Sequence, residues 1–165
     1  MSRPAVFLDR DGVINRERGA HTWRVEDFEL LPTVGQALCA LGEAGWSRIV
    51  ITNQSGIGLG LYTHADVERL HAYLHAQLAN DGAGLDAVYY CPHHPTQGRC
   101  LCRKPGALLL ERAIARYDID VERSVMIGDR ERDVEAAAAA GVRGILVQPN
   151  MALSHVLHEH GILSA

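Results

Sequence analysis

The chain has 165 residues, of which 16 are Lys or Arg and 20 are Asp or Glu, so its formal net charge is −4. With 47% hydrophobic and 22% charged residues it can bury a real core, which excludes intrinsic disorder. No run approaches the ~20 apolar residues of a membrane span, and the lack of a Lys/Arg block argues against a dedicated nucleic-acid binder. We expect one domain over residues 1–165.

Apolar runs of strand length alternate along the chain with longer segments of helical period. The alternation predicts an α/β fold with a doubly wound parallel sheet. Ligands of such sheets bind beyond the carboxyl ends of the strands, so the residues that follow each strand are the functional candidates. The expected strands are Ala5–Leu8, Arg48–Thr52, Ala87–Tyr90, Val125–Gly128 and Gly144–Val147, and the expected helices lie near 33–44, 64–80, 107–117, 131–140 and 152–160.

Two carboxylates follow the first expected strand, in the run Asp9-Arg10-Asp11-Gly12. In an extended chain, residues i and i+2 point to the same side, so Asp9 and Asp11 can share one site. Such a pair suits a nucleophile beside a general acid, or a shared cation. A polar turn that merely closes the strand gives the same pattern.

The second expected strand ends in Thr52-Asn53-Gln54-Ser55-Gly56. A hydroxyl, two amides and a glycine that lets backbone N–H groups turn inward can form an oxyanion cradle. Ser, Asn and Gly also form ordinary loops, so this segment alone indicates little.

The expected helix over 64–80 begins with a capping box, Thr63 to Asp66. His71 and His75 lie one turn apart on this helix, and because no third metal ligand is evident we expect them on a solvated face. We expect the histidines of the last helix to lie at the surface as well: His155, His158 and His160.

Three of the four cysteines are clustered after the third expected strand. Cys91, His93, Cys100 and Cys102 form two pairs, and three thiolates with one imidazole match the tetrahedral preference of a structural Zn²⁺. His94 is the alternative fourth ligand. No signal peptide opens the chain, so we expect a cytoplasmic protein with reduced thiols, which favours metal over disulfides. We expect the remaining cysteine, Cys39, in a helix core.

Further charged residues follow the zinc loop (residues 91–102) and the fourth strand. Arg103 and Lys104 adjoin Cys102 directly, and we hypothesise that bound zinc aims both cations at a substrate phosphate. Asp129 and Asp133 begin the next helix, where Asp129 could complete a Mg²⁺ site with Asp9. The simpler interpretations are a helix N-cap for Asp129 and a partner of the helix dipole for Asp133.

Together these groups suit phosphoryl transfer through an aspartyl-phosphate. Asp9 would attack phosphorus, and Asp11 would protonate the leaving oxygen and then take a proton from the hydrolytic water. Thr52 and Lys104 would hold the oxygens of the transferring group, and Mg²⁺ would offset the charge between nucleophile and substrate.

These motifs resemble those of the haloacid dehalogenase (HAD) superfamily: Asp-x-Asp-Gly, Thr-Asn, a following Lys and Gly-Asp-x-x-x-Asp, in this order over nearly the whole chain. The resemblance implies that Asp9 is the nucleophile and Asp11 the general acid/base. It also implies that Asp9, the Asp11 backbone carbonyl and Asp129 bind Mg²⁺. The chain has no room for a separate cap domain, so we expect an open, capless active site.

Within the superfamily, the zinc loop is similar to that of the heptose-bisphosphate and histidinol-phosphate phosphatases. Asn15 and the pair Gln54-Ser55 favour the heptose group, whereas the short spacing between His93 and Cys100 is closer to the histidinol-phosphate pattern. The similarity implies that substrate is contacted by Gln54, Ser55, Arg103 and Arg130.

The expected partner is a small phosphorylated metabolite, most simply a sugar bisphosphate, with neither nucleic acid nor membrane, and the expected state is a monomer. Two other functions remain open. An open site would admit the end of a polymer, as in a nucleic-acid 3′-phosphatase. A non-catalytic, zinc-stabilised binding protein could use the same fold, although binding alone does not require Asp9, Asp11, Lys104 and Asp129 together.

Overall fold

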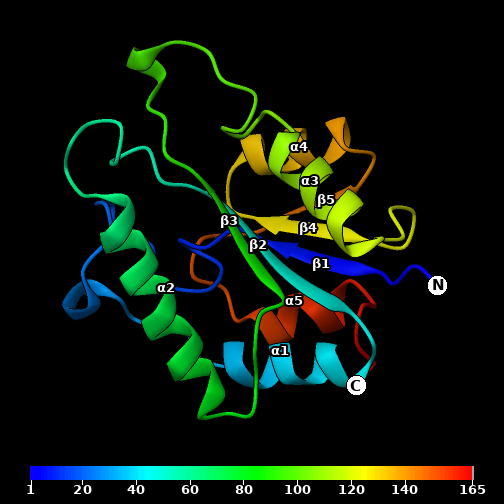
Figure 1. Cartoon of the computed structure of the whole chain (residues 1–165). Coiled ribbons are helices and arrows are strands. Elements are labelled where there is room, and N and C mark those ends of the chain that lie inside the picture. The colour runs from blue at the N-terminus through cyan, green and yellow to red at the C-terminus, as the bar shows by residue number, and fades with distance from the viewer. Residues whose placement is uncertain (165) are drawn as a thin grey trace.

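A five-stranded parallel sheet forms the centre of the molecule, as the sequence pattern predicts. The computed structural model describes residues 1–164. The strand order is β3-β2-β1-β4-β5, and all paired neighbours run parallel (Figure 1). The strands are β1 (Ala5–Leu8), β2 (Ser47–Asn53), β3 (Ala87–Cys91), β4 (Val125–Gly128) and β5 (Arg143–Leu146).

Helices cover both faces of this sheet, and each predicted helix and strand lies within one residue of its expected bounds. Two short 3-10 helices, η1 (Val25–Asp27) and η2 (Pro95–Gln97), were not predicted. The capping box at Thr63 is confirmed, since its side chain accepts from the Asp66 N–H and Asp66 accepts from the Thr63 N–H. The helices are α1 (Val34–Glu43), α2 (His64–Ala79), α3 (Leu108–Tyr117), α4 (Glu131–Ala139) and α5 (Leu153–Glu159).

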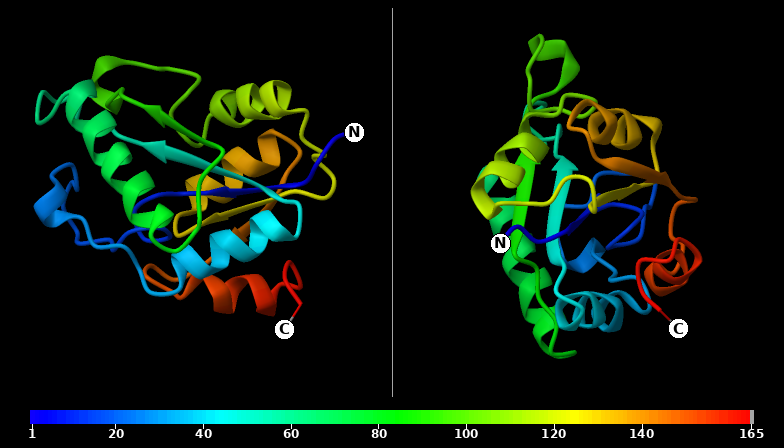
Figure 2. Two further views of the ribbon diagram at one scale, coloured as in Figure 1. Left: turned by 60° about the horizontal axis from the view of Figure 1, so that its bottom comes forward. Right: turned by 90° about the vertical axis from the view of Figure 1, so that its right-hand side faces the viewer.

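The core divides into two layers because successive strand residues point to opposite faces of the sheet. On β1, Val6 and Leu8 pack with α1, α2 and α5, whereas Ala5 and Phe7 pack with α3 and α4. Figure 2 shows the same three-layer arrangement, with α1 and α5 on the side of the sheet opposite α3 and α4. Because both faces are covered, the strands carry continuous apolar runs.

The prediction for Cys39 is wrong. Its side chain is half-buried, and its Sγ lies 3.9 Å from Oε1 of Glu43. The buried stripe of α1 runs through Val34, Leu38 and Leu41, and Cys39 falls beside that stripe. The prediction for the last helix is closer, since His155 and His158 are exposed and His160 is half-buried.

Two loops lie at the carboxyl edge of the sheet. The chain after β1 passes through η1 before reaching α1, and the chain after β3 passes through η2 before reaching α3. The second loop extends away from the sheet in Figure 1. Among residues 1–164, both connections contain only these 3-10 turns and no further helix or strand, and none of the helices described is long and apolar enough to cross a membrane.

Candidate active site

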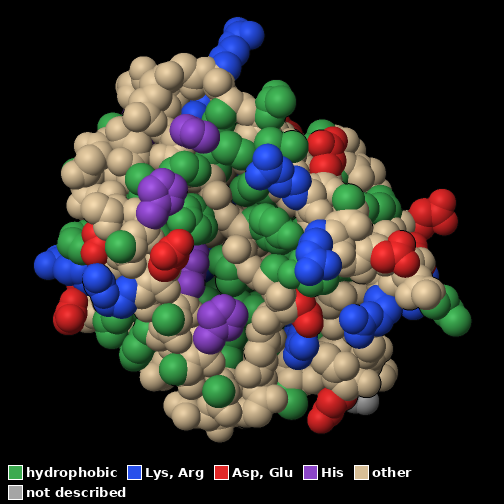
Figure 3. All heavy atoms as spheres, viewed as in Figure 1, with side chains coloured by type: hydrophobic (Ala, Val, Ile, Leu, Met, Phe, Trp, Pro, Cys, Tyr) green, Lys and Arg blue, Asp and Glu red, His purple; other side chains and the backbone are tan. Residues whose placement is uncertain are grey.

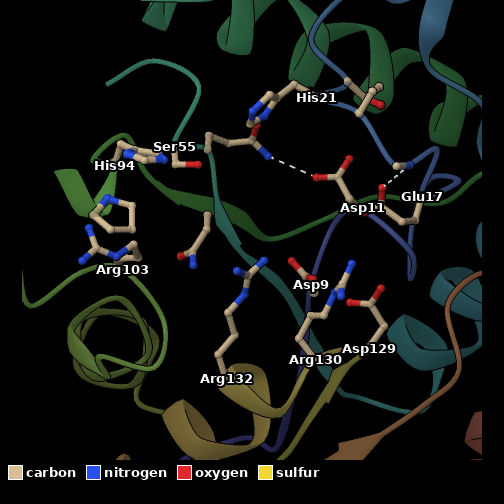
Figure 4. A pocket seen from close by; sticks show the side chains of 16 residues that line it. Asp9, Asp11, Glu17, His21, Ser55, His94, Arg103, Asp129, Arg130 and Arg132 are labelled. Atoms are coloured by element: carbon tan, nitrogen blue, oxygen red, sulfur yellow. Dashed lines mark hydrogen bonds between the residues drawn. The ribbon is translucent and has the colours of Figure 1, made fainter. Parts of the chain in front are cut away.

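A cavity of about 470 Å³ lies at the carboxyl edge of the sheet, where the ends of β1, β2 and β4 meet (Figure 4). The structure therefore brings together side chains that the sequence placed at separate strand ends. Thr52 and Lys104 do not line the cavity. They lie buried, with 1% and 2% of their surface exposed. The predicted residues that do line it are Asp9, Asp11, Gln54, Ser55, Arg103, Asp129 and Arg130.

The turn after β1 places Asp9 and Asp11 on the same cavity. The Asp9 N–H continues the sheet by donating to the Ile127 carbonyl at 3.0 Å. Gly12 then turns the chain with φ +87°, a conformation that favours glycine. A Cβ on Gly12 would lie 2.3 Å from Oδ2 of Asp129, so the glycine also lets the two strand ends approach.

Lys104 forms the floor of the site beneath Asp9. Its Nζ donates to Oδ1 of Asp9 at 3.0 Å and to the Ile51 carbonyl at 2.7 Å, and it lies 2.6 Å from Oδ1 of Asp133. Burial opposes the charge on Lys104, but the Asp9 and Asp133 carboxylates outweigh it and raise the Lys104 pKa. A buried ammonium requires such partners.

The position of Lys104 is also fixed through its backbone. Asn53, at the end of β2, accepts from the Lys104 N–H at 3.0 Å and donates to the Lys104 carbonyl at 3.2 Å. From the sequence, Asn53 is expected in an oxyanion cradle and as part of the Thr-Asn motif. Its pairing with position 104 joins two segments that are 51 residues apart, and spacing along the chain gave no signal for it.

Asp133 belongs to the site rather than only to its helix. Its carboxylate is fully buried, pairs with Lys104 and accepts from the N–H of Arg130, the N-cap residue of α4, at 3.1 Å. The N-cap interpretation of Asp129 is thus wrong, because Arg130 is the N-cap, and the dipole interpretation of Asp133 is incomplete, because its carboxylate also pairs with Lys104. A Cβ on Gly128 would lie 2.3 Å from the Asp133 side chain, so a small residue is needed there.

Three carboxylates form an acidic cluster at the bottom of the cavity. One oxygen each from Asp9, Asp129 and Asp133 lies within 4.8 Å of the others. Burial and the negative charges of Asp133 and Asp11 outweigh the positive charge of Lys104 and raise the pKa of Asp9 to about 7. Burial and the charge of Asp133 also raise the pKa of Asp129, whose Oδ2 is buried without a hydrogen-bond partner. A cation bound among these carboxylates would offset their mutual repulsion, and the unpartnered Asp129 oxygen is a suitable ligand for a hard cation such as Mg²⁺.

Asp11 has a different environment from Asp9. Its Oδ1 accepts from Arg10 at 3.1 Å and from Asn15 at 3.0 Å, and its Oδ2 accepts from Gln54 at 3.3 Å (dashed in Figure 4). Burial favours the neutral carboxyl, but the charge of Arg10 and the hydrogen bonds from Asn15, Arg10 and Gln54 outweigh it and lower the pKa of Asp11. The two carboxyls of the pair therefore have pKa values shifted in opposite directions: the surroundings of Asp9 favour its neutral form, and those of Asp11 favour its ionised form.

The amide of Gln54 is held on three sides. Its Nε2 donates to Asp11 and, at 3.0 Å, to Oγ1 of Thr52, while its Oε1 accepts from the Tyr62 hydroxyl at 2.9 Å. Tyr62 in turn stacks on Trp23, with ring centroids 5.8 Å apart. Gln54 thus lines the cavity and also supports Asp11.

The cysteine cluster has the geometry of a metal site. Ligand atoms of Cys91, His93, Cys100 and Cys102 lie within 4.8 Å of one another. Individual separations range from 3.0 Å, between Cys102 and Cys91, to 3.8 Å, between Cys91 and Cys100. Sulfur ligands about 2.3 Å from a tetrahedral zinc lie about 3.8 Å apart, so the donor set fits Zn²⁺. His94 is not in the cluster: its Nδ1 pairs with Thr96, and its side chain lines the cavity instead.

The prediction for His71 is wrong. Its side chain is 7% exposed and points inward, with Nε2 3.2 Å from Nη1 of Arg10, whereas His75 is exposed as expected. Helical spacing alone placed the two histidines on one face. The buried charge of Arg10, which His71 meets, could not be deduced from the pattern of α2.

Several residues of the cavity wall were not predicted from the sequence. Glu17, His21 and Thr22 from the loop after β1, and Arg132 from α4, all line the cavity. No motif in the sequence marks these individual members of the loop. Arg132 lies beside the predicted Arg130 in the run that begins α4, which is the one available signal for it.

Known proteins resemble this chain over most of its length. A family model described as HAD-hydrolase-like matches residues 101–159. The heptose 1,7-bisphosphate 7-phosphatase of Haemophilus ducreyi is 38% identical over 161 residues, which cover 93% of this chain and 88% of that one. The corresponding phosphatase of Thermosynechococcus vestitus is 44% identical over 158 residues, covering 90% and 80%. The chain belongs to the heptose-bisphosphate phosphatase family of the HAD superfamily.

Solved structures agree with this family assignment. The D,D-heptose 1,7-bisphosphate phosphatase from B. bronchiseptica, complexed with magnesium and phosphate, superposes with a TM-score of 0.84 at 36% identity, covering 98% of this chain and 89% of that one. The predicted HAD fold and phosphatase class are thus confirmed. As a member of the heptose-bisphosphate phosphatase family, the protein is a phosphatase, and the non-catalytic alternative is set aside.

Proposed function

We propose that the protein is a Mg²⁺-dependent phosphatase that removes the 7-phosphate of D-glycero-D-manno-heptose 1,7-bisphosphate. The observation that carries the proposal is the convergence of Asp9, Asp11 and Asp129 on one cavity with Arg103 and Arg130. The family relatives named for this reaction support the choice of substrate. The other residue roles implied by the sequence are part of the same proposal.

In the first step, a carboxylate oxygen of Asp9 attacks phosphorus, and the bond between phosphorus and the sugar oxygen breaks. Asp11 donates a proton to that oxygen as it leaves. The approach of a substrate dianion supplies a reason for Asp11 to be protonated, because a nearby negative charge raises the pKa of a carboxyl group. In the second step, Asp11 takes a proton from water as the water attacks phosphorus, which frees inorganic phosphate and restores Asp9.

The remaining buried residues stabilise charge around the phosphoryl group. Lys104 and Thr52 lie below Asp9 and Gln54, where they can support the equatorial oxygens as these gain charge. Asp9, the Asp11 backbone carbonyl and Asp129 would hold Mg²⁺, with Asp133 fixing Lys104 beside them. The cation supplies charge neutralisation between an anionic nucleophile and an anionic substrate.

The cavity wall is suited to a second phosphate. Arg103, Arg130 and Arg132 line the same cavity as Asp9, so a bisphosphate can place one phosphate at Asp9 and meet cations with the other. We propose Gln54 and Ser55 as further substrate contacts. On the face drawn in Figure 3, basic and acidic side chains of the described residues are scattered in small groups, which favours a small metabolite over a nucleic acid.

We propose that the cluster of Cys91, His93, Cys100 and Cys102 binds a structural Zn²⁺. Four protein ligands leave no open position, which is typical of a structural site. Its thiols must stay reduced to bind metal, so we also propose a cytoplasmic location. We further propose that residues 1–165 form a single domain that acts as a monomer.

A panel of phosphate esters tests the proposed function. We expect purified protein with Mg²⁺ to release phosphate from the heptose bisphosphate with a kcat/KM well above that for histidinol phosphate or a 3′-phosphorylated oligonucleotide. ³¹P NMR of the product should show that the phosphate on carbon 1 is retained. A preference for histidinol phosphate would show that the proposed substrate is wrong. If no ester, including an aryl phosphate, released phosphate in the presence of Mg²⁺, the mechanism would be contradicted.

A further inference from the structure

Arg10 is a fully buried cation within the nucleophile loop. Its guanidinium contacts three acceptors: Nη2 donates to Oδ1 of Asp11 at 3.1 Å and to the Thr22 carbonyl, and Nη1 lies 3.2 Å from Nε2 of His71. Its Nε, by contrast, is buried without a partner. A buried charge is tolerated only when its hydrogen bonds are made, so these three acceptors decide how the guanidinium lies.

The contact with His71 fixes the state of the imidazole. A guanidinium can only donate, so Nε2 of His71 must be the acceptor, and the neutral ring carries its proton on Nδ1. Burial, followed by the charge of Arg10, lowers the pKa of His71 to about 3, in agreement with a neutral ring. The Tyr90 ring packs against the imidazole in a T-shaped arrangement, with centroids 5.9 Å apart, and helps to hold it in place.

The hydrogen bonds that link His71 to Arg10 continue from Arg10 to Asp11. Asn15 and Gln54 also donate to Asp11, but among residues 1–164 Arg10 is the only cation that forms an ion pair with this carboxylate. If Nη1 lost its acceptor, the guanidinium would turn to find another, and the bond from Nη2 to Asp11 would move with it. His71 lies on α2, so it is not in any of the segments that directly follow the strands and carry the sequence motifs.

We propose that His71 is a positioning residue for the phosphatase reaction. As a neutral hydrogen-bond acceptor it orients the Arg10 guanidinium, and through Arg10 it holds the Asp11 carboxyl where it can reach the leaving oxygen. The inference rests on the proposed function, because it assumes that Asp11 is the general acid. It assigns a role to a histidine that the nucleophile motif does not contain.

The test compares two substituted side chains that differ in reach. The amide of His71→Gln lies near the position of Nε2 and can accept from Arg10, whereas the amide of His71→Asn corresponds to Nδ1 and falls short. Each variant is assayed for kcat/KM with an alkyl phosphate, whose leaving oxygen needs a proton, and with p-nitrophenyl phosphate, whose leaving oxygen does not. His75→Asn, one turn along α2 and exposed, is the matched control.

We expect His71→Asn to lose about 10²-fold in kcat/KM for the alkyl phosphate, the scale of a misplaced catalytic group, and far less for p-nitrophenyl phosphate. His71→Gln should retain most activity with both esters, and His75→Asn should match wild type. If His71 had only a structural role, His71→Asn would lower the activity with both esters by the same factor, because a smaller folded fraction affects every substrate alike. Equal losses in His71→Asn, or no rescue in His71→Gln, would overturn the inference.

Asp11→Asn separates this inference from the proposed function. If Asp11 is the general acid, this variant also loses more activity with the alkyl than with the aryl ester. Should Asp11→Asn show that signature while His71→Asn does not, only the role of His71 is refuted. Should Asp11→Asn lack it, the assignment of Asp11 as the acid is wrong, and the inference about His71 is overturned with it.

Discussion

Asp9→Asn is expected to abolish phosphate release, with kcat falling by a factor on the order of 10⁴ or more, as when other covalent nucleophiles are removed. The amide has nearly the same size as the carboxylate but cannot attack phosphorus. It also removes an anionic oxygen from the cluster with Asp129 and Asp133, which weakens the proposed Mg²⁺ site. The measurement is steady-state phosphate release at saturating Mg²⁺.

The fold should survive this substitution. Burial raises the pKa of Asp9 to about 7, well above its usual value, so the ionised carboxylate is destabilised in the folded protein at higher pH. Lys104 keeps Asp133 and the Ile51 carbonyl as partners when Asp9 is replaced. A thermal melt near that of wild type is therefore expected, and Glu135→Gln, an exposed carboxylate on α4, should leave activity unchanged. Substantial activity in folded Asp9→Asn would contradict the mechanism.

Removal of the proposed zinc is expected to have the second-largest effect. The loop of residues 91–102 contributes few apolar side chains to the core, so metal ligation must hold much of its shape. Structural zinc contributes about 10–16 kcal/mol of apparent folding energy in zinc-finger peptides. Arg103 and Lys104 follow the last ligand directly, so a loosened loop should displace Arg103 from the cavity and Lys104 from its place beneath Asp9. We expect Cys100→Ser to lose zinc and about 10²-fold in kcat/KM.

The zinc prediction is measured by metal analysis and kinetics at constant Mg²⁺. Chelation of wild type should reproduce the loss seen in Cys100→Ser, and added Zn²⁺ should restore only wild type. Cys39→Ser, outside the cluster, should keep both zinc and activity. The two hydrogen bonds between the Asn53 side chain and the Lys104 backbone, one donated by each residue, anchor Lys104 independently of the zinc. Unchanged kinetics after proven zinc loss would show that this anchor alone positions Lys104.

Sequence reasoning could place the elements and most of the site because each rests on a local signal. Apolar runs such as Arg48–Thr52 fix the strands, and a parallel sheet brings all carboxyl ends to one edge. The positions of Asp9, Asp11 and Asp129 follow from that rule. The proximity of Cys91 and Cys100 could also be predicted from a local signal, because two ligand pairs of this spacing indicate one metal site.

What the sequence could not show was set by contacts between distant segments. The exposure of His71 depends on the buried guanidinium of Arg10, which reaches across to α2. The role of Asp133 depends on Lys104, whose Nζ lies 2.6 Å from Oδ1 of Asp133. Such contacts join buried polar groups whose partners are set by tertiary packing, and neither helical period nor motif spacing encodes them.

The central claim, that Asp9 carries the phosphoryl group, is tested most directly by quenching wild-type enzyme in acid during turnover of the heptose bisphosphate. Acyl phosphates survive brief acid treatment, so peptide mass spectrometry can locate the modified residue. The account predicts one added phosphoryl group on Asp9, removed by hydroxylamine and absent from Asp9→Asn. A phosphoryl group on any other residue, or none in an enzyme shown by rapid mixing to accumulate a covalent intermediate, would contradict it.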